Sequence, residues 1–161
     1  MPIILTSLLI FTDILTKEAA IAFLKNQPST PLLGHLLRLT YGENTGSAFS
    51  QFQGMVTSLI WISFACILFV FYAIRKSKTK MEKAGYYLIL SGATGNLIDR
   101  LFRGYVVDFL DFDFFDIHIP SLWIIPEMNL ERWPVFNFAD SYICIGVSIV
   151  LLSVWLSNKT Q

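Results

Sequence analysis

Two aspartates, far apart in the sequence, have the residue type and the setting to act together in catalysis. Asp108 lies in the segment GYVVDF at 104–109, and Asp140 lies in FNFADSYICIG at 136–146. Each stands beside an apolar stretch, where two facing carboxylates cannot both ionise and therefore share one proton. One carboxylate can then activate a water while the other donates to a carbonyl oxygen. This is acid–base hydrolysis, and it needs neither a metal nor a covalent intermediate.

Each aspartate also has an explanation without chemistry. Asp140 begins an apolar stretch, where the dipole of a helix favours a negative charge. Asp108 is, on this reading, a solvated loop charge. The residues alone leave this structural explanation open beside the catalytic one.

The composition indicates that membrane helices must position the two aspartates. Of the 161 residues, 54% are hydrophobic and 15% are charged, against about 25% charged in soluble domains. The mean hydropathy is +0.57. Twelve acids and twelve bases exclude a nucleic-acid binder that works through bulk positive charge. The apolar content excludes intrinsic disorder, and the length predicts a single membrane domain.

Four stretches have about the 20 apolar residues that cross a bilayer as a helix. They are residues 3–24, 55–74, 84–103 and 139–157. Polar residues interrupt the first stretch, and it lacks a basic start, so we expect a retained helix rather than a signal peptide. The third stretch is apolar until Asp99.

The basic residues predict the orientation. The loop at 75–83, RKSKTKMEK, holds five of the twelve bases, and the positive-inside rule puts it in the cytoplasm. Both termini are then cytoplasmic, while the segments at 25–54 and 104–138 are extracytoplasmic. In a compact bundle, Asp108 and Asp140 lie at one level near the outer interface.

The two outer segments show strand-like patterns. Residues 36–52 combine alternation with Gly and Asn, which predicts short strands and a tight turn. Residues 109–119 alternate Phe and Asp, which predicts an amphipathic strand or a segment lying on the membrane. Four side chains there are of metal-ligand type: Asp111, Asp113, Asp116 and His118. Their spacing fits no metal-binding loop, so a solvated face is favoured and no metal site is predicted.

Other catalytic arrangements are less well supported. The sequence has no HExxH, GxSxG or GxxxxGK[ST] motif. His35 and His118 lie outside the apolar stretches, so a Ser–His pair lacks its base. A Ser–Lys pair through Lys17 stays open. Cys66 and Cys144 are predicted to be small apolar core residues.

Five ordered blocks carry a resemblance to a known family. They are DILTK at 13–17, NTGSAF at 44–49, GATGNLIDR at 92–100, GYVVDF at 104–109 and FNFADSYICIG at 136–146. On these blocks the chain resembles the bacterial lipoprotein signal peptidases (signal peptidase II), over nearly its whole length. Each block alone is short, but five in this order on four apolar stretches are specific.

The resemblance implies an all-α integral membrane fold. It has four transmembrane helices, with a small β-structured cradle and an interfacial segment on the extracytoplasmic face. It further implies an aspartic protease of the bacterial cytoplasmic membrane, without a cofactor, in which Asp108 and Asp140 are the catalytic pair. The substrates would be prolipoproteins whose lipobox cysteine carries diacylglycerol, cut just before that cysteine. A monomer in contact with membrane lipids, with no nucleic-acid partner, is the simplest expectation.

Other polar residues then acquire supporting roles. Asn44, Asn96 and Asn137 are expected to orient the peptide backbone or the aspartates through amide hydrogen bonds. Arg100 is expected to give electrostatic or structural support beside the site.

Further residues within the apolar stretches suit helix packing. Asp13 and Lys17 stand at i and i+4, so they can pair on one face of a helix. A structural role for this pair and a place near the substrate both stay open. Asp99 is expected to form an ion pair or a packing contact. Gly92 and Gly95 are expected to let helices approach closely.

Two other functional classes remain as alternatives. A proton- or ion-coupled transporter needs ionisable residues near the midplane and broken helices in repeated halves. Here the acids gather toward one face and no repeat is visible. A membrane partner without chemistry would leave Asp108 and Asp140 replaceable.

Overall fold

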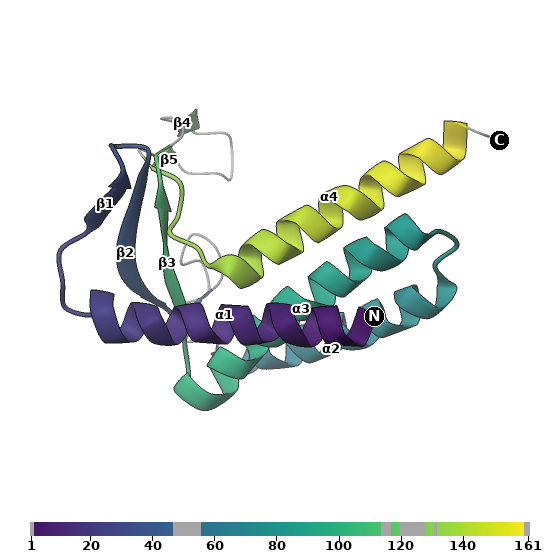
Figure 1. The fold of residues 1–161 in the computed structure, drawn as a ribbon, viewed down its shortest axis with the longest axis horizontal. Coiled ribbons are helices and arrows are strands. Elements are labelled where there is room, and N and C mark those ends of the chain that lie inside the picture. The colour runs from purple at the N-terminus through teal and green to yellow at the C-terminus, as the bar shows by residue number, and fades with distance from the viewer. Residues whose placement is uncertain (1, 47–55, 114–116, 120–127, 131, 160–161) are drawn as a thin grey trace.

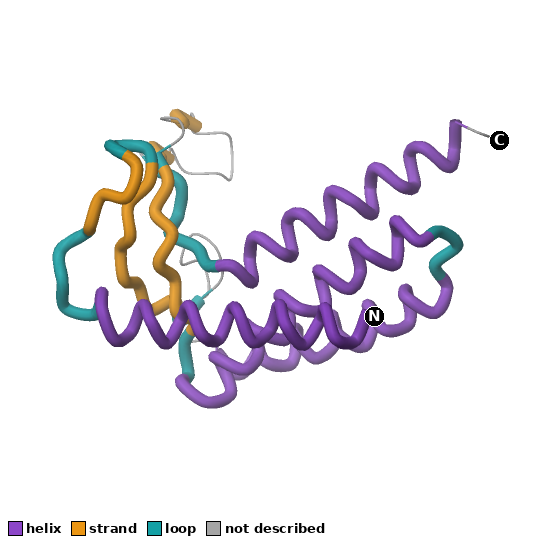
Figure 2. Tube along the Cα trace, viewed as in Figure 1, coloured by secondary structure: helices purple, strands orange, loops and turns teal. Residues whose placement is uncertain are grey.

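The computed structural model describes residues 2–46, 56–113, 117–119, 128–130 and 132–159. Its helices are α1 (Pro2–Leu24), α2 (Val56–Lys76), α3 (Lys80–Arg103) and α4 (Phe138–Lys159). Its strands are β1 (Thr30–Leu33), β2 (Leu37–Asn44), β3 (Val106–Phe112), β4 (Ile117–Ile119) and β5 (Met128–Leu130). The fold is mostly helical, with β1, β2 and β3 gathered at one end of the helices (Figures 1 and 2).

The four predicted apolar stretches are all helical, but the basic loop between the second and third is shorter than expected. Residues 75–83 were predicted to be a loop, whereas only 77–79 separate α2 from α3. Arg75 and Lys76 continue α2, where the helix dipole favours positive charge. Thr79 caps α3 by accepting a hydrogen bond from the backbone of Glu82 (3.0 Å).

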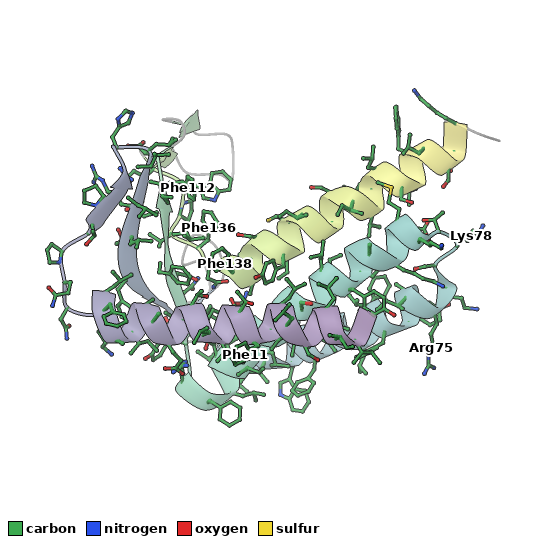
Figure 3. All side chains as sticks on the ribbon, in the orientation of Figure 1. Phe11, Arg75, Lys78, Phe112, Phe136 and Phe138 are labelled. Atoms are coloured by element: carbon green, nitrogen blue, oxygen red, sulfur yellow. The ribbon has the colours of Figure 1, made fainter. Side chains whose placement is uncertain are left out.

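Apolar side chains cover the outside of the helices, and polar side chains lie between them. Leu68 and Phe69 of α2 are 69% and 65% exposed, and Phe11 of α1 also lies on the outside (Figure 3). This distribution suits helices whose surroundings are apolar. Of the described helices, α2 and α4 are long and apolar enough to cross a membrane.

Small residues bring α3 against its neighbours α1 and α4. A Cβ on Gly85 would lie 2.7 Å from the carbonyl oxygen of Gly146, so the two backbones are in contact there. Gly92 lies against the carbonyl of Ala139, and the space beside Gly95 is filled by the carboxylate of Asp13. The predicted close helix approach at Gly92 and Gly95 is therefore confirmed.

A three-stranded antiparallel sheet, in the order β1-β2-β3, carries part of the polar residues. Strand β2 confirms the strand predicted within 36–52, of which residues 47–52 lie outside the described part. Strand β3 confirms a strand at the start of 109–119, and β1 was not predicted. In the β2–β3 pairing, Asp108 lies opposite Gly42, two positions along from the pairing of Asn44 with Val106.

A short turn connects α3 to β3. Gly104 ends the helix in the left-handed conformation (φ 77°), and its N–H bonds to the carbonyl of Arg100. The chain then enters β3, where Val107 and Phe109 pack with Ala20 of α1 in the core. The side chain between them, Asp108, faces the opposite side of the strand. The α2–α3 connection, with Arg75 and Lys78, lies at the other end of the molecule (Figure 3).

Candidate active site

Asp108 and Asp140 come from two elements that meet at the sheet end of the helices. Asp108 lies in β3 and is 4% exposed, so the reading of this residue as a solvated loop charge is wrong. The error arose because the strand that buries it follows a helix after only two residues. Asp140 lies half-buried in the first turn of α4, as the helix-dipole argument predicted.

Asp140 is held by reciprocal hydrogen bonds at the start of α4. The backbone N–H of Asn137 donates to Oδ2 of Asp140 (3.2 Å), and the N–H of Asp140 donates to Oδ1 of Asn137 (3.0 Å). This is the geometry of a capping box, in which each side chain satisfies the other residue's backbone. The carboxylate is thereby fixed at the positive end of the helix.

Two amide groups hold Asp108. Nδ2 of Asn137 donates to one carboxylate oxygen (2.7 Å), and Nδ2 of Asn44 donates to the other (3.0 Å). The oxygen of Asn44 accepts from the backbone N–H of Gly46 (3.0 Å), which sets the orientation of the Asn44 amide. Asn137 therefore contacts both aspartates, and β2 and β3 meet α4 at this point.

Asn96 of α3 completes the group. Its Nδ2 donates to Oδ1 of Asp140 (2.8 Å), while its Oδ1 accepts from Nζ of Lys17 (3.0 Å). The structure thus brings together all three predicted asparagines with both aspartates. Lys17 joins this group from α1, through Asn96.

Burial dominates the electrostatics of Asp108. Burial, followed by the negative charge of Asp140, raises the pKa of Asp108 to about 7. Among the described residues, neither carboxylate forms an ion pair. Arg100 interacts electrostatically with both and lies in the same cavity, but its hydrogen bond goes to the carbonyl of Asn96 (3.5 Å).

The pair opens into a cavity of about 990 Å³. Its polar part contains Asn44, Asn96, Arg100, Asp108 and Asp140. Its apolar part comes from α2, α3 and α4, and includes Ile62, Cys66, Ile89, Ala93, Ile143 and Cys144. The cavity also includes Trp133 to Phe136, which the sequence patterns did not single out.

The prediction that Cys66 and Cys144 are core residues is wrong. Both thiols are exposed, and both line this cavity. Between α3 and α4, glycines occupy the closest helix contacts, which leaves the larger Cys144 side chain on the cavity wall.

A second group of charges lies directly behind the first. Lys17 is fully buried, and its Nζ lies 2.9 Å from Oδ2 of Asp13 and 3.2 Å from Oδ2 of Asp99. The predicted Asp13–Lys17 pair is therefore present, and Asp99 also pairs with Arg103 (2.9 Å). With Asn96, the Lys17 ammonium has three oxygen partners for its three donors. In the described part of the chain none of its partners is a serine, so the contacts of Lys17 give the Ser–Lys alternative no support.

The acidic residues that follow Asp108 serve the sheet. Arg132 bridges Asp111 (2.9 Å) and Asp113 (2.8 Å), and Thr40 donates to Asp111 (2.8 Å). Asp111 is 7% exposed, so a solvated face is wrong for this residue, because its ion pair offsets its burial. Asp116 lies outside the described residues. In the described part of the chain, no three His, Cys, Asp or Glu residues are grouped to hold a metal ion.

Comparison with known proteins decides the family. The sequence profile described as Signal peptidase (SPase) II matches residues 5–156. The chain belongs to the signal peptidase II family. It is 40% identical to the lipoprotein signal peptidase of Caldicellulosiruptor bescii, over 86% of this chain and 79% of that one. With that of Borrelia hermsii it shares 34% identity over 98% and 92% of the two chains.

Solved structures agree with this membership. A bacterial membrane enzyme determined at 2.3 Å superimposes with a TM-score of 0.81 and 25% identity, covering 99% of this chain and 90% of that one. A second, determined at 1.9 Å, has a TM-score of 0.77 and 26% identity, covering 95% and 91%. The signal peptidase described here is thus a bacterial membrane protease.

Proposed function

We propose that Asp108 and Asp140 perform the hydrolysis by which this signal peptidase removes signal peptides from diacylglyceryl-modified prolipoproteins. The observation that carries the proposal is the pair itself. Two carboxylates from β3 and α4 are held by amide donors, and among the described residues by no ion pair, in the wall of a largely apolar cavity. Such a pair retains one proton and one negative charge, which are the acid and the base that water-mediated hydrolysis needs.

The proton belongs to Asp108 near neutral pH, because burial and the charge of Asp140 raise its pKa to about 7. Asp140 then takes a proton from a water, whose oxygen attacks the scissile carbonyl carbon. Asp108 donates its proton to the carbonyl oxygen, and a tetrahedral diol forms. On collapse, Asp140 gives its proton to the leaving amine nitrogen, and Asp108 recovers a proton from a diol hydroxyl. Both aspartates return to their starting states.

All four helices cross the membrane in this proposal, and the sheet lies on the extracytoplasmic face. The charges support this topology. The bases of the α2–α3 turn are far from the sheet, and the positive-inside rule assigns such a turn to the cytoplasm (Figure 3). Both termini are then cytoplasmic, and residues 1–161 form one membrane domain. The aspartates lie near the outer interface, where the acyl chains of the substrate hold its cysteine.

The apolar part of the cavity supports a lipid-modified substrate. Ile62, Ile89 and Ile143 come from three different helices and offer a lateral apolar surface for acyl chains or for the signal peptide. Asn44 and Arg100 supply polar groups in the same cavity. One chain contributes all of these residues, so the enzyme acts as a monomer and needs no cofactor.

The test replaces each aspartate without changing its shape. Asp108→Asn and Asp140→Asn are each expected to reduce cleavage of a diacylglyceryl prolipoprotein by at least about 1,000-fold, since each removes one proton-transfer group. The matched control is Asp111→Asn, which lies in the same strand and is also buried, but is paired with Arg132. It should keep most of the activity. Near-normal cleavage by either of the first two variants would exclude the proposal.

A further inference from the structure

The three asparagines around the aspartates share one feature. Each turns its NH₂ group toward a carboxylate, and each has its oxygen occupied by a donor on the other side. The pairs of amide oxygen and donor are Asn44 with the Gly46 N–H, Asn137 with the Asp140 N–H, and Asn96 with the Lys17 ammonium. The Asn96 oxygen also accepts a longer bond, from Nδ2 of Asn137 (3.3 Å). The first two donors are backbone groups within three residues of the asparagine. The third is a charged side chain from another helix, 79 residues away in sequence.

Lys17 is the nearer and the charged one of the two donors that fix the direction of the Asn96 amide. An ammonium has three donors and no acceptor, so only the oxygen of Asn96 can lie 3.0 Å from Nζ. If the amide were reversed, its NH₂ group would face the ammonium, and a buried donor would lose its partner. The NH₂ group must therefore lie against Asp140, at 2.8 Å.

The orientation of this amide affects the two protonation states of Asp140 differently. An ionised carboxylate only accepts hydrogen bonds, so an NH₂ group stabilises it. An amide oxygen in the same place would instead favour a protonated carboxyl group, which can donate. Asn44 and Asn137 donate to Asp108 in the same way, but burial outweighs them and raises the pKa of Asp108. The orientation of Asn96 adds to this difference, because it favours the negative charge on Asp140.

We propose that Lys17 is a positioning residue, which locks the Asn96 amide and thereby keeps Asp140 as the ionised member of the pair and Asp108 as its protonated member. The inference rests on the proposed function, because it assigns the roles within that catalytic pair. Lys17 does not touch the substrate in this account. It acts through Asn96, and the buried Asp13 and Asp99 keep its own charge in place.

The surrounding charges give the inference a pH signature. Burial and Asp140 raise the pKa of Asp108, whereas the charge of Lys17 lowers it. Other elements also place charges around Asp108. Arg100 of α3 interacts with it electrostatically, and Glu43 of β2 lines the same cavity. The charged residues of α2, Arg75 and Lys76, lie at the far end of that helix. Loss of the Lys17 charge is therefore expected to move the alkaline limb of the activity profile to higher pH. Release of the Asn96 amide is a separate effect: it lets the shared proton lie on Asp140 for part of the time, which lowers kcat at every pH.

The experiment uses the full-length enzyme in detergent with a diacylglyceryl prolipoprotein. Lys17→Met is expected to lower kcat by about 10- to 100-fold, with little change in KM. This decrease is smaller than the one expected when a hydrogen-bond donor that contacts the reacting atoms is removed. The alkaline limb should move to higher pH. The matched control is Arg103→Met, which removes another cation from Asp99 but contacts neither Asn96 nor the aspartates. It should lower the melting temperature without moving the pH profile.

Two further variants make the result decisive. Lys17→Met with Asp13→Asn keeps the buried group neutral, so it reports on the amide even where Lys17→Met alone folds poorly. In an Asn96→Ala background, Lys17→Met should cost no further kcat, because the residue through which it acts is gone. A normal kcat in the double variant, or full additivity with Asn96→Ala, would overturn the inference. Asp140→Asn is measured in parallel. If Asp140→Asn cleaves the substrate, the proposed function is overturned. If Asp140→Asn is inactive but the Lys17→Met/Asp13→Asn variant is normal, only the role of Lys17 is overturned.

Discussion

Two groups of acidic residues lie on either side of Asn96, and they differ in how their charge is balanced. On one side, Asp13 and Asp99 are paired with Lys17 and Arg103. On the other side, Asp108 and Asp140 have amide donors as their partners. We call the first group the paired cluster and the second the aspartate pair. Asn96 joins them, accepting from the paired cluster and donating to the aspartate pair.

The difference separates stability from reactivity. A cation beside a carboxylate favours its ionised form and leaves it no proton to donate. An amide donor satisfies the hydrogen-bonding needs of a carboxylate without cancelling its charge. The paired cluster can therefore join α1 to α3, whereas the aspartate pair keeps the uneven protonation that hydrolysis needs.

Giving the aspartate pair a cation is expected to have the largest effect on this comparison. Asn44→Lys puts an ammonium where an amide now donates to Asp108, which lowers the pKa of Asp108 and removes its proton at neutral pH. We expect kcat to fall by about 100- to 1,000-fold at pH 7, within the range of lost general acid catalysis. Cleavage kinetics measure this.

The control for this substitution is Thr45→Lys. Thr45 is exposed and lines the same cavity, but in the described part of the chain its side chain makes no hydrogen bond to Asp108. It should lose much less activity. Equal losses of activity in the two variants would contradict this expectation. They would show that a positive charge anywhere in the cavity inhibits cleavage, whether or not it lies beside the aspartate pair.

The pH dependence of the unmodified enzyme should show the next effect. Asp108 must hold its proton to act as the acid, and its pKa is raised to about 7. Above that pH the acid form declines tenfold per unit, so kcat/KM should fall about 100-fold over the next two units. A profile that stays level through this range would contradict the assignment of Asp108 as the acid.

Substitutions in the two groups should change the stability of the protein in opposite directions. Asp13→Ala leaves the backbone N–H of Ala139 and part of the Lys17 charge without a partner, and should cost about 3 kcal/mol of unfolding free energy. Asp108→Asn should instead raise the melting temperature at alkaline pH. Because folding raises the pKa of Asp108 from 3.8 to about 7, stability declines as pH rises through this interval, and the amide removes that loss.

Thermal denaturation in detergent at acidic and alkaline pH measures both effects. The gain from Asp108→Asn should vanish at a pH near the ordinary pKa of an aspartate, where both states of the protein hold the proton. The same gain at every pH would mean that the substitution acts through packing and not through charge.

A chelator should have the smallest effect. The locked amides turn NH₂ groups, not oxygens, toward Asp108 and Asp140, and a divalent cation prefers oxygen ligands. Cleavage in EDTA should equal cleavage without it. Strong inhibition that added metal reverses would contradict the two-carboxylate mechanism.

Much of the fold could be predicted from local patterns. Long apolar stretches predicted all four helices, because length and hydropathy are local properties. The helix ends at the basic turn were missed, because lysines and arginines favour a helix C-terminus as readily as a loop. Strand β1 was missed as well. It is short and fully exposed, so it has no buried face to produce an alternating pattern.

The candidate site was predicted in its residues but not in its connections. Asp13 and Lys17 pair within one helix, so their spacing was enough to predict the contact. The hydrogen bond from Lys17 to Asn96 joins two helices, and no spacing within the sequence encodes it. The burial of Asp108 depends on β2 and α4, which are remote in sequence, so the local pattern around Asp108 does not distinguish it from a loop charge.

The central claim is that the aspartate pair holds a proton and the paired cluster does not. Infrared difference spectroscopy during a pH titration measures this directly, through the C=O stretch of a protonated carboxyl group. We predict one such band that disappears as the pH rises through about 7, is absent in Asp108→Asn, and persists in Asp13→Asn. A band that persists in Asp108→Asn and is lost in Asp13→Asn would contradict the account.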